Sequence, residues 1–222
     1  MAEENNAALI RRIASVVGHE LRNPMAVIKN SAYFVKAKLG QDGKLDPKVE
    51  KHLGIVDAEI GRADRLIGDI LVYSRVMEAK PAEIALNAVV EAALAAVTVP
   101  EKIKVKKELA KSDPKAKADE KLVADAIRRF LDNAIDAMPE GGTLAVKTSA
   151  SGKEVSVTVS DTGAGVKPDF APLLFQPFAT TKPRGLGLGL AMAKKIADAN
   201  KGKVAGGSLK GGGASFTFSL PA

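Results

Sequence analysis

The fold of the N-terminal third depends on the stretch VVGHELRNPMAVI, residues 16–28. Apolar or small residues recur through and around it at alternating steps of three and four, which is the period of one helical face. These positions are Ile10, Ala14, Val17, Leu21, Pro24, Ile28, Ser31 and Val35. His19 lies off that face, so we expect its ring on the flank of a packed helix, where a solvated surface histidine is the simplest interpretation.

The neighbours of His19 favour chemistry over a plain surface role. Glu20 is a carboxylate beside the imidazole, and it could take a ring proton if the other nitrogen attacked an electrophile. Asn23 follows four residues later on the same helix face and could hold a water there. Pro24 removes a helical N–H at a cost of about 3 kcal/mol and predicts a kink. Strain beside a candidate nucleophile indicates function.

Two long helices account for the first part of the chain. The first runs from about Asn5 to Leu39, and GQDGKLDP, residues 40–47, breaks it. The second runs from about Pro47 to Met77 with a regular apolar face. That face consists of Val49, Leu53, Val56, Ile60, Ala63, Ile67, Ile70 and Ser74. Because a hairpin cannot cover both sides of its apolar stripe, we expect a homodimer that forms a four-helix bundle.

A domain boundary follows the second helix. EAKPAEIAL, residues 78–86, reads as a linker, because Pro81 ends the helical pattern. We therefore predict an all-α hairpin domain at residues 1–79 and a second domain at residues 80–222. His52 has no paired acid or nearby proline, and we interpret it as a solvated surface residue.

The second domain alternates between helical and strand patterns. We expect helices at Asn87–Thr98, at Asp119–Met138 with Asp119 as the cap, and at about Leu188–Ala199. We expect strands at Ile103–Leu109, Thr143–Thr148, Glu154–Ser160, Lys203–Leu209 and Ala214–Leu220. The predicted fold is an α+β sandwich, in which a mixed sheet carries helices on one face.

Composition limits the classes of function. The chain has 222 residues, 46% of them hydrophobic, which is enough for two modest domains with real cores. It has no cysteine, no apolar run that could cross a bilayer and no signal-peptide pattern, so we expect a soluble, cytoplasmic protein. The net charge of +7 comes from basic residues interleaved with acids, and only 4% of residues are aromatic. Nucleic-acid binding is therefore disfavoured, and an acidic partner fits better.

Two short stretches of the second domain carry candidate ligand chemistry. In DNAID, residues 132–136, the side-chain oxygen of Asn133 could bind a hard cation such as Mg²⁺ held mainly by nucleotide phosphates. In DTGAG, residues 161–165, glycines could let the backbone approach a flat ring, and Asp161 could accept from an exocyclic amine such as that of adenine. A tight turn would explain DTGAG equally well.

A third stretch, FQPFATTKPRGLGLGL, ends where a helix begins. Gly185, Gly187 and Gly189 lead into the helix N-terminus, where N–H groups and the helix dipole favour phosphate oxygens. Lys182 and Arg184 could add positive charge from a mobile loop. A flexible glycine turn is the alternative, because the stretch matches neither the dinucleotide fingerprint nor a P-loop.

Taken together and in this order, the motifs resemble the transmitter core of the two-component sensor histidine kinases. That core is a dimerisation and phosphotransfer hairpin followed by an ATP-binding domain of the kind shared with gyrase, heat-shock protein 90 and the mismatch-repair ATPases. HELRNP is similar to the family's phosphoacceptor motif, and LVYSR is similar to the close of its second helix. DNAIDAMPEGG, DTGAGV, FQPFATTK and GLGLGLAMAKKI are similar to its four nucleotide motifs, so the similarity covers nearly the whole chain.

The resemblance implies a role for each candidate residue. His19 would be the phosphoacceptor, Glu20 its acid/base partner, and Asn23 the residue that positions water for dephosphorylation of an aspartyl phosphate. Asn133 would bind Mg²⁺, and Asp161 would bind the adenine amine. The other implied ATP contacts are Gly163 and Gly165 to the ring, Gly185, Gly187 and Gly189 to the phosphates, and a lid with Phe175, Phe178, Thr181 and Lys182.

The implied activity is that of a protein-histidine kinase, with ATP- and Mg²⁺-dependent autophosphorylation of His19. Phosphotransfer to a response-regulator aspartate and a phosphatase activity would accompany it. The chain shows no sensor or membrane segment, so sensing would need a separate partner or a longer protein.

Arg129 departs from the family pattern, which commonly has a second Asn there, four residues before Asn133. The Arg129 cation could bind phosphate directly or repel Mg²⁺. A scaffold or phosphatase with a degenerate ATP site is therefore the alternative. A gyrase-like conformational ATPase is disfavoured, because the related ATPases have a glutamate at this position.

Overall fold

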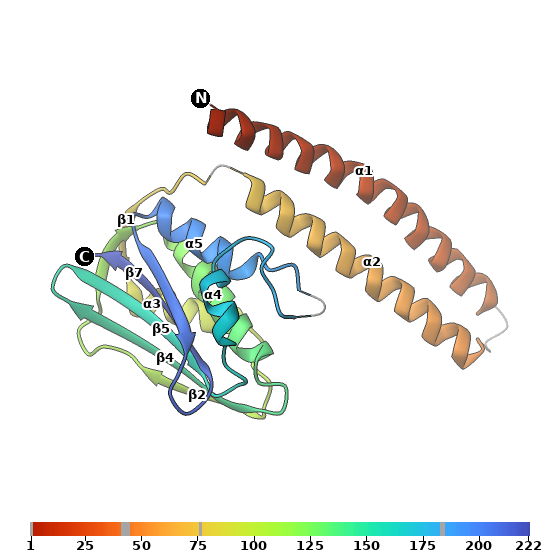
Figure 1. Ribbon diagram of the computed structural model, residues 1–222. Coiled ribbons are helices and arrows are strands. Elements are labelled where there is room, and N and C mark those ends of the chain that lie inside the picture. Colours follow the sequence, from red (N-terminus) through yellow and green to blue (C-terminus); the bar gives the residue numbers. More distant parts are fainter. Residues whose placement is uncertain (1, 41–44, 76, 183–184) are drawn as a thin grey trace. The chain divides into compact units, whose positions relative to one another are not determined.

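The computed structural model describes residues 2–40, 45–75, 77–182 and 185–222, with side chains in the first helix described from Val16 onward. The chain divides into two compact units, Met1–Val76 and Met77–Ala222 (Figure 1). Among the described residues, no helix combines the length and apolar character needed to cross a membrane.

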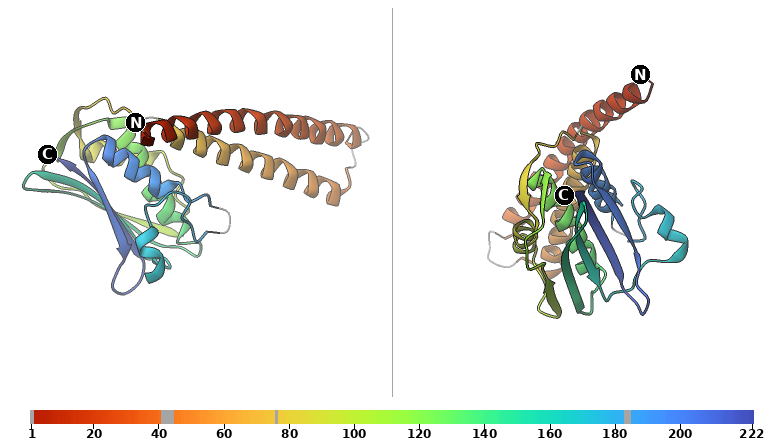
Figure 2. Two further views of the ribbon diagram at one scale, coloured as in Figure 1. Left: turned by 45° about the horizontal axis from the view of Figure 1, so that its top comes forward. Right: turned by 90° about the vertical axis from the view of Figure 1, so that its left-hand side faces the viewer.

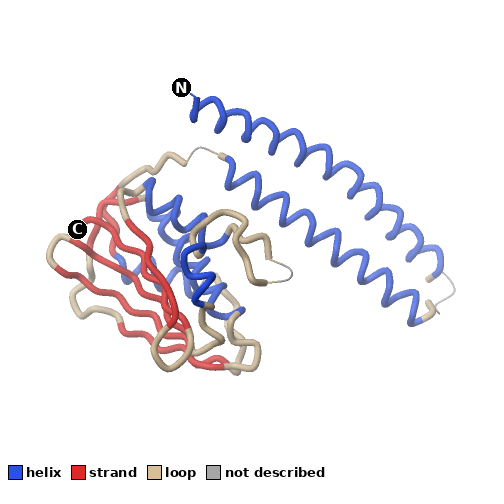
Figure 3. The backbone as a smooth tube through the Cα atoms, in the orientation of Figure 1, coloured by secondary structure: helices blue, strands red, loops and turns tan. Residues whose placement is uncertain are grey.

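Unit 1 is a helical hairpin (Figure 3). Its helices are α1, Ala2–Leu39, and α2, Pro47–Ser74. Asp46 caps α2 by accepting a hydrogen bond from the N–H of Lys48 at 2.7 Å, and Pro47 supplies a helical φ at the first position. Both predicted helices are confirmed, and residues 41–44 of the predicted break lie outside the described residues.

The face of α1 that packs on α2 is shifted by one residue from the apolar face that the sequence predicted. Gly18 is buried there, and a Cβ on Gly18 would lie 3.0 Å from Leu71 Cδ1 and 3.1 Å from Ile67 Cγ2. The absence of a side chain at Gly18 lets the large side chains of α2 fill this space. The predicted face remains between 42% and 51% exposed at Val17, Leu21, Ile28 and Val35.

Unit 2 is an α+β sandwich, as predicted. The larger of the two sheets among its described residues has the strand order β2-β4-β5-β7-β6, in which β2 and β4 are parallel and the other pairs antiparallel. The strands are β2, Ile103–Glu108; β4, Gly142–Ser151; β5, Glu154–Asp161; β6, Lys203–Ser208; and β7, Ala214–Pro221.

The helices of unit 2 cover one face of this sheet (Figure 1 and Figure 2). They are α3, Leu86–Ala95; α4, Glu120–Asp136; and α5, Gly189–Ala199. Asp119 caps α4 as predicted, by accepting a hydrogen bond from Leu122 N at 3.1 Å. In the core, the rings of Phe130 and Phe216 lie 5.7 Å apart between α4 and β7.

Alternate residues of β5 point toward the helices, because side chains of a strand alternate between its two faces. Val155, Val157 and Val159 are buried on this side. The same alternation turns Asp161, the last residue of β5, toward the core, and its exposed fraction is only 2%. A carboxylate thus occupies a position at which the strand pattern otherwise places valine.

Strands β1, Ala82–Ala85, and β3, Lys115–Ala118, were not predicted. They pair antiparallel, with Ala82 opposite Ala118. The prediction that residues 78–86 form a linker was therefore wrong for residues 82–85, because the strand forms only against a partner far away in the sequence. A 3₁₀ helix, η1, at Pro168–Leu173 precedes the loop that leads to α5.

Candidate functional site

His19 lies on α1 with an exposed side chain in the single chain, and Glu20 and Asn23 are exposed as well. None of these three side chains has a hydrogen-bond partner within the described residues. An imidazole that is exposed and not engaged internally is available to a reactant from outside. The helix continues through Pro24 to Leu39. His52 is exposed on α2, in agreement with its interpretation as a surface residue.

Arg22 joins the two helices of unit 1 close to His19. Its Nε lies 2.7 Å from Asp64 Oδ1 on α2. Both side chains are substantially exposed, so solvent screens the pair and its contribution to stability is about 1 kcal/mol at most. Its effect is to fix one face of α1 against α2 one turn beyond His19.

Asp161 is the central residue of the site in unit 2. Its Oδ1 accepts hydrogen bonds from Gly163 N at 2.9 Å and Ala214 N at 3.2 Å, which hold the carboxylate in one orientation. Its Oδ2 is buried and has no hydrogen-bond partner among the described residues. Burial raises the pKa of Asp161, and the two N–H groups and the charge of Lys182 oppose that rise. A buried oxygen without a donor is costly, so this atom marks where a donor from a ligand would be accepted.

The glycines beside Asp161 are required by the chain itself. A Cβ on Gly163 would collide with the backbone carbonyl of Ala137, at the end of α4. Gly165 has a φ of +71°, and a Cβ there would lie 2.9 Å from the carbonyl oxygen of Gly213. A tight turn packed against its neighbours therefore accounts for both residues, and their contact with a ligand ring stays a prediction.

Sequence reasoning missed Gly213. Its φ is +82°, and a Cβ at this position would collide with the carbonyl group of Asp161. Gly213 thus lets β7 begin directly beside the carboxylate, where the N–H of Ala214 can reach it. The sequence feature that could have indicated Gly213 is the run of three glycines at residues 211–213, a pattern that is also typical of an ordinary turn between strands.

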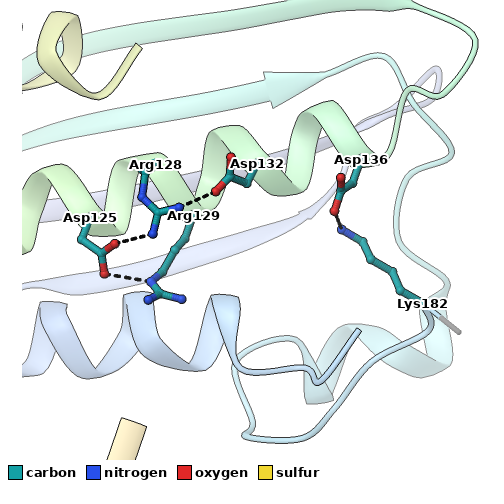
Figure 4. A network of polar contacts seen from close by, with 6 residues as sticks. All are labelled: Asp125, Arg128, Arg129, Asp132, Asp136 and Lys182. Atoms are coloured by element: carbon teal, nitrogen blue, oxygen red, sulfur yellow. Dashed lines mark hydrogen bonds and ion pairs between the residues drawn. The ribbon is translucent and has the colours of Figure 1, made fainter. Parts of the chain in front are cut away.

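Charged residues along α4 form a chain of ion pairs (Figure 4). Arg128 contacts both Asp125 and Asp132 at 2.7 Å, and Arg129 Nε lies 2.9 Å from Asp125 Oδ2. The Arg129 side chain is only 13% exposed and points toward α5. The carboxylate of Asp125 therefore offsets the charge of Arg129 at the position where the family commonly has a second Asn.

Asn133 lies one turn beyond Arg129. Its Oδ1 accepts a hydrogen bond from Lys182 Nζ at 2.9 Å, and the same ammonium group contacts Asp136 Oδ2 at 2.9 Å. Figure 4 shows Lys182 reaching α4 from the loop before α5. Sequence reasoning gave Asp136 no role, although its i+3 spacing from Asn133 places both on one helix face.

The loop that carries Lys182 is anchored at one end by an aromatic contact. The ring of Phe175 meets Phe216 edge to face, with 6.4 Å between ring centroids. Phe178 is exposed and has a φ of +64°, which is uncommon for a residue with a side chain. Thr181 is exposed as well, and Arg184 lies outside the described residues.

The glycines that lead into α5 differ in their surroundings. Gly187 has a φ of +71°, and a Cβ there would collide with the backbone of Ala179. A Cβ on Gly185 would lie 3.1 Å from Thr180 Oγ1, whereas a Cβ on Gly189 would meet nothing within 4 Å. The N-cap residue of α5, Leu188, makes no side-chain capping hydrogen bond. The Cα of Gly189 therefore borders open space on its Cβ side, and no side chain caps the first N–H groups of α5.

Two family models match the chain. The model of the His Kinase A (phospho-acceptor) domain matches residues 9–79, and that of the histidine kinase-, DNA gyrase B- and HSP90-like ATPases matches residues 118–222. The chain belongs to the sensor histidine kinases of two-component systems. Members of this family are protein-histidine kinases, and the residues matched by the first model include His19 and those matched by the second include Asn133, Asp161 and Gly189.

Individual sensor histidine kinases agree with this membership. The chain is 30% identical over 225 residues to the signal transduction histidine-protein kinase AtoS of Escherichia coli (strain K12), an alignment covering 100% of this chain and 36% of AtoS. The crystal structure of full-length ShkA in complex with AMPPNP has a TM-score of 0.75 at 26% identity and covers 95% of this chain and 45% of ShkA.

The histidine kinase ThkA, in complex with the response regulator TrrA, shares the fold. It has a TM-score of 0.71 at 23% identity, with 98% of this chain and 63% of ThkA covered. The present chain spans about a third to a half of the length of the curated sensor kinases it matches.

Proposed function

We propose that the chain is the transmitter core of an ATP-dependent protein-histidine kinase and that His19 accepts the γ-phosphoryl group. The observation that carries this proposal is Asp161, whose buried Oδ2 lacks a donor among the described residues. The exocyclic amine of adenine is a donor of the required kind. The AMPPNP bound to ShkA supports ATP as the nucleotide, and the exposed ring of His19 supports its role as acceptor.

The rest of unit 2 would hold the nucleotide around this anchor. The N-terminus of α5 at Gly189, which no side chain caps, would receive phosphate oxygens, and the Lys182 ammonium would add a countercharge. When bound, Mg²⁺ neutralises charge on the transferred group, and the oxygen of Asn133 is a ligand of the type it prefers. The remaining proposed contacts are those of Gly163, Gly165, Gly185, Gly187, Phe178 and Thr181.

The proposed reaction uses the imidazole of His19 as a nucleophile. One ring nitrogen attacks the γ-phosphorus, the bond to the bridging oxygen breaks, and ADP leaves with the electron pair. The proton on the other ring nitrogen passes to the carboxylate of Glu20. A response-regulator aspartate then attacks the phosphorus of phospho-His19 and the P–N bond breaks; the complex of ThkA with TrrA supports such a partner. Asn23 would position water for the phosphatase reaction.

We also propose that unit 1 forms the homodimer. The apolar face of α1 stays half-exposed in the single chain, at Val17, Leu21, Ile28 and Val35. A second hairpin packed on this face would bury it in a four-helix bundle. The proposed domains are residues 1–79 for dimerisation and phosphotransfer and 80–222 for ATP binding, and a sensor domain would lie on a partner or on a longer chain.

A phosphorylation assay tests the proposed acceptor. Incubation with labelled ATP and Mg²⁺ should give an acid-labile, base-stable label on the protein. His19→Gln should abolish the label, whereas His52→Gln, which changes the exposed histidine of α2, should retain it. Label retained in His19→Gln would show that another residue is the acceptor.

A second candidate function rests on Arg129, which replaces a common family residue. If Arg129 repelled the bound cation, the chain would be a scaffold or a phosphatase that binds nucleotide poorly. The ion pair with Asp125 argues against this, because it offsets the repulsion. Titration of the unaltered chain and of Arg129→Asn with ATP distinguishes the two functions. Mg²⁺-dependent binding that is similar in both proteins supports the kinase. Binding that appears only in Arg129→Asn supports the scaffold or phosphatase.

A further inference from the structure

The oxygens of two α4 side chains converge on one positively charged atom. Asn133 Oδ1 and Asp136 Oδ2 each lie 2.9 Å from Lys182 Nζ. The two oxygens come from positions i and i+3 of the helix, while the ammonium comes from a loop 46 or more residues away in the sequence. The end of α4 therefore presents an amide oxygen and a carboxylate oxygen to a single cation.

The cation at this place is a replaceable one. Lys182 is a compact charge on a flexible stem, and its side chain is 41% exposed, while that of Asp136 is 63% exposed. Solvent screens a pair this exposed, so a stronger competitor can displace the ammonium. Mg²⁺ is such a competitor, because it is bound in nucleotide sites by one or two carboxylate or amide oxygens together with phosphates.

The neighbouring charged side chains of α4 form ion pairs with one another. Arg129 is a cation and is paired with Asp125, so it cannot serve as a metal ligand. Asp132 is paired with Arg128 at 2.7 Å. Among the residues that Figure 4 labels, Asp136 is the carboxylate that contacts no arginine.

We propose that Asp136 is, with Asn133, a protein ligand of the divalent cation that accompanies the nucleotide, and that Lys182 occupies this place until the cation arrives. The proposal rests on the proposed function, because it requires that unit 2 binds ATP. The carboxylate of Asp136 supplies a negatively charged ligand at a site where Arg129 stands in place of the neutral Asn that is common in the family.

This arrangement makes Lys182 and the cation competitors for the same two oxygens. Removal of the Asp136 carboxylate should weaken the dependence of nucleotide binding on Mg²⁺. Removal of the Lys182 ammonium should strengthen that dependence, because nothing then has to be displaced. The opposite signs distinguish competition from a general loss of structure, which would weaken binding in both variants.

The test measures AMPPNP affinity of the full chain by titration calorimetry, once in excess EDTA and once at saturating Mg²⁺. The dissociation constant in EDTA divided by that in Mg²⁺ reports the coupling between cation and nucleotide. We expect Asp136→Ala to reduce this ratio by about tenfold, the low end of the usual loss when a metal site is perturbed. Lys182→Met should increase it several-fold.

Matched controls come from the ion pair of Lys194 with Asp198 on α5. That pair has the same 2.9 Å separation, and its side chains are similarly exposed, at 50% and 60%. Asp198→Ala and Lys194→Met should leave the ratio unchanged. If Asp136→Ala binds AMPPNP with an unaltered ratio, the assignment of Asp136 is overturned while ATP binding stands. If the unaltered chain binds no AMPPNP, the proposed function fails, and the assignment fails with it.

Discussion

The substitution Asp161→Asn should separate nucleotide binding from folding. An asparagine keeps one oxygen that can accept from the N–H groups of Gly163 and Ala214, so the turn after β5 should survive. The other oxygen becomes an NH₂ group, which donates hydrogen bonds and would face the donating amine of adenine. We therefore expect the variant to fold normally and to bind ATP weakly.

The size of the effect follows from the unpaired Oδ2 of Asp161. A hydrogen bond to a charged group contributes about 1.5 to 3 kcal/mol, and about 1.4 kcal/mol corresponds to a tenfold change in affinity. Affinity for AMPPNP should therefore fall roughly 10- to 150-fold. Without nucleotide the variant should be at least as stable as the parent, because burying a neutral amide costs less than burying a carboxylate whose pKa burial has raised.

Titration calorimetry with AMPPNP and thermal unfolding without nucleotide measure the two halves of this prediction. Asp198→Asn, an exposed change on α5, is the control for a general loss of one negative charge. Unchanged AMPPNP affinity in Asp161→Asn would refute the adenine assignment. A large fall in melting temperature would show instead that the Asp161 carboxylate is needed for folding.

Further predictions concern the surroundings of the same carboxylate. Because the pKa of Asp161 is raised in the folded state, its carboxylate lowers the free energy of unfolding at neutral pH, and this cost is relieved as pH falls through that pKa. AMPPNP affinity should decline over the same pH range. Unfolding and AMPPNP titrations at several pH values should show both changes in the parent and neither in Asp161→Asn. Gly213→Ala should lower both the melting temperature and AMPPNP affinity, because its Cβ would collide with the carbonyl of Asp161. Gly212→Ala, at a φ of +106° with nothing within 4 Å, should show only the backbone strain of about 1 to 3 kcal/mol. Asn200→Ala should reduce the free energy of unfolding by about 1 to 3 kcal/mol in denaturant titrations, since it removes the buried acceptor that Asp119 N reaches at 2.7 Å.

Local patterns were sufficient for the main elements of the fold. The 3.6-residue period predicted both helices of unit 1, and strand alternation with the Asp119 cap predicted the helices and most strands of the sandwich. The motifs also indicated Asp161 and Asn133 as candidate site residues. Each of these features depends on residues within a few positions of one another, which is the range over which a sequence pattern carries information.

Other features depended on contacts between distant segments. The pairing of β1 with β3, and the one-residue shift of the packed face of α1, required knowledge of which surface each segment meets. Which of the motif glycines stands beside open space was equally invisible, because the neighbour that crowds Gly163 belongs to another element.

By itself the sequence determined the period of each element, the order of the motifs and hence the family and the types of chemistry available. Tertiary structure alone decided that one oxygen of Asp161 is buried without a donor among the described residues, and that Lys182 meets Asn133 and Asp136. The physical reason is that these contacts join distant segments: Lys182 lies 46 residues from Asp136, and Ala214, whose N–H binds Asp161, lies 53 residues from it. No local periodicity encodes such an encounter.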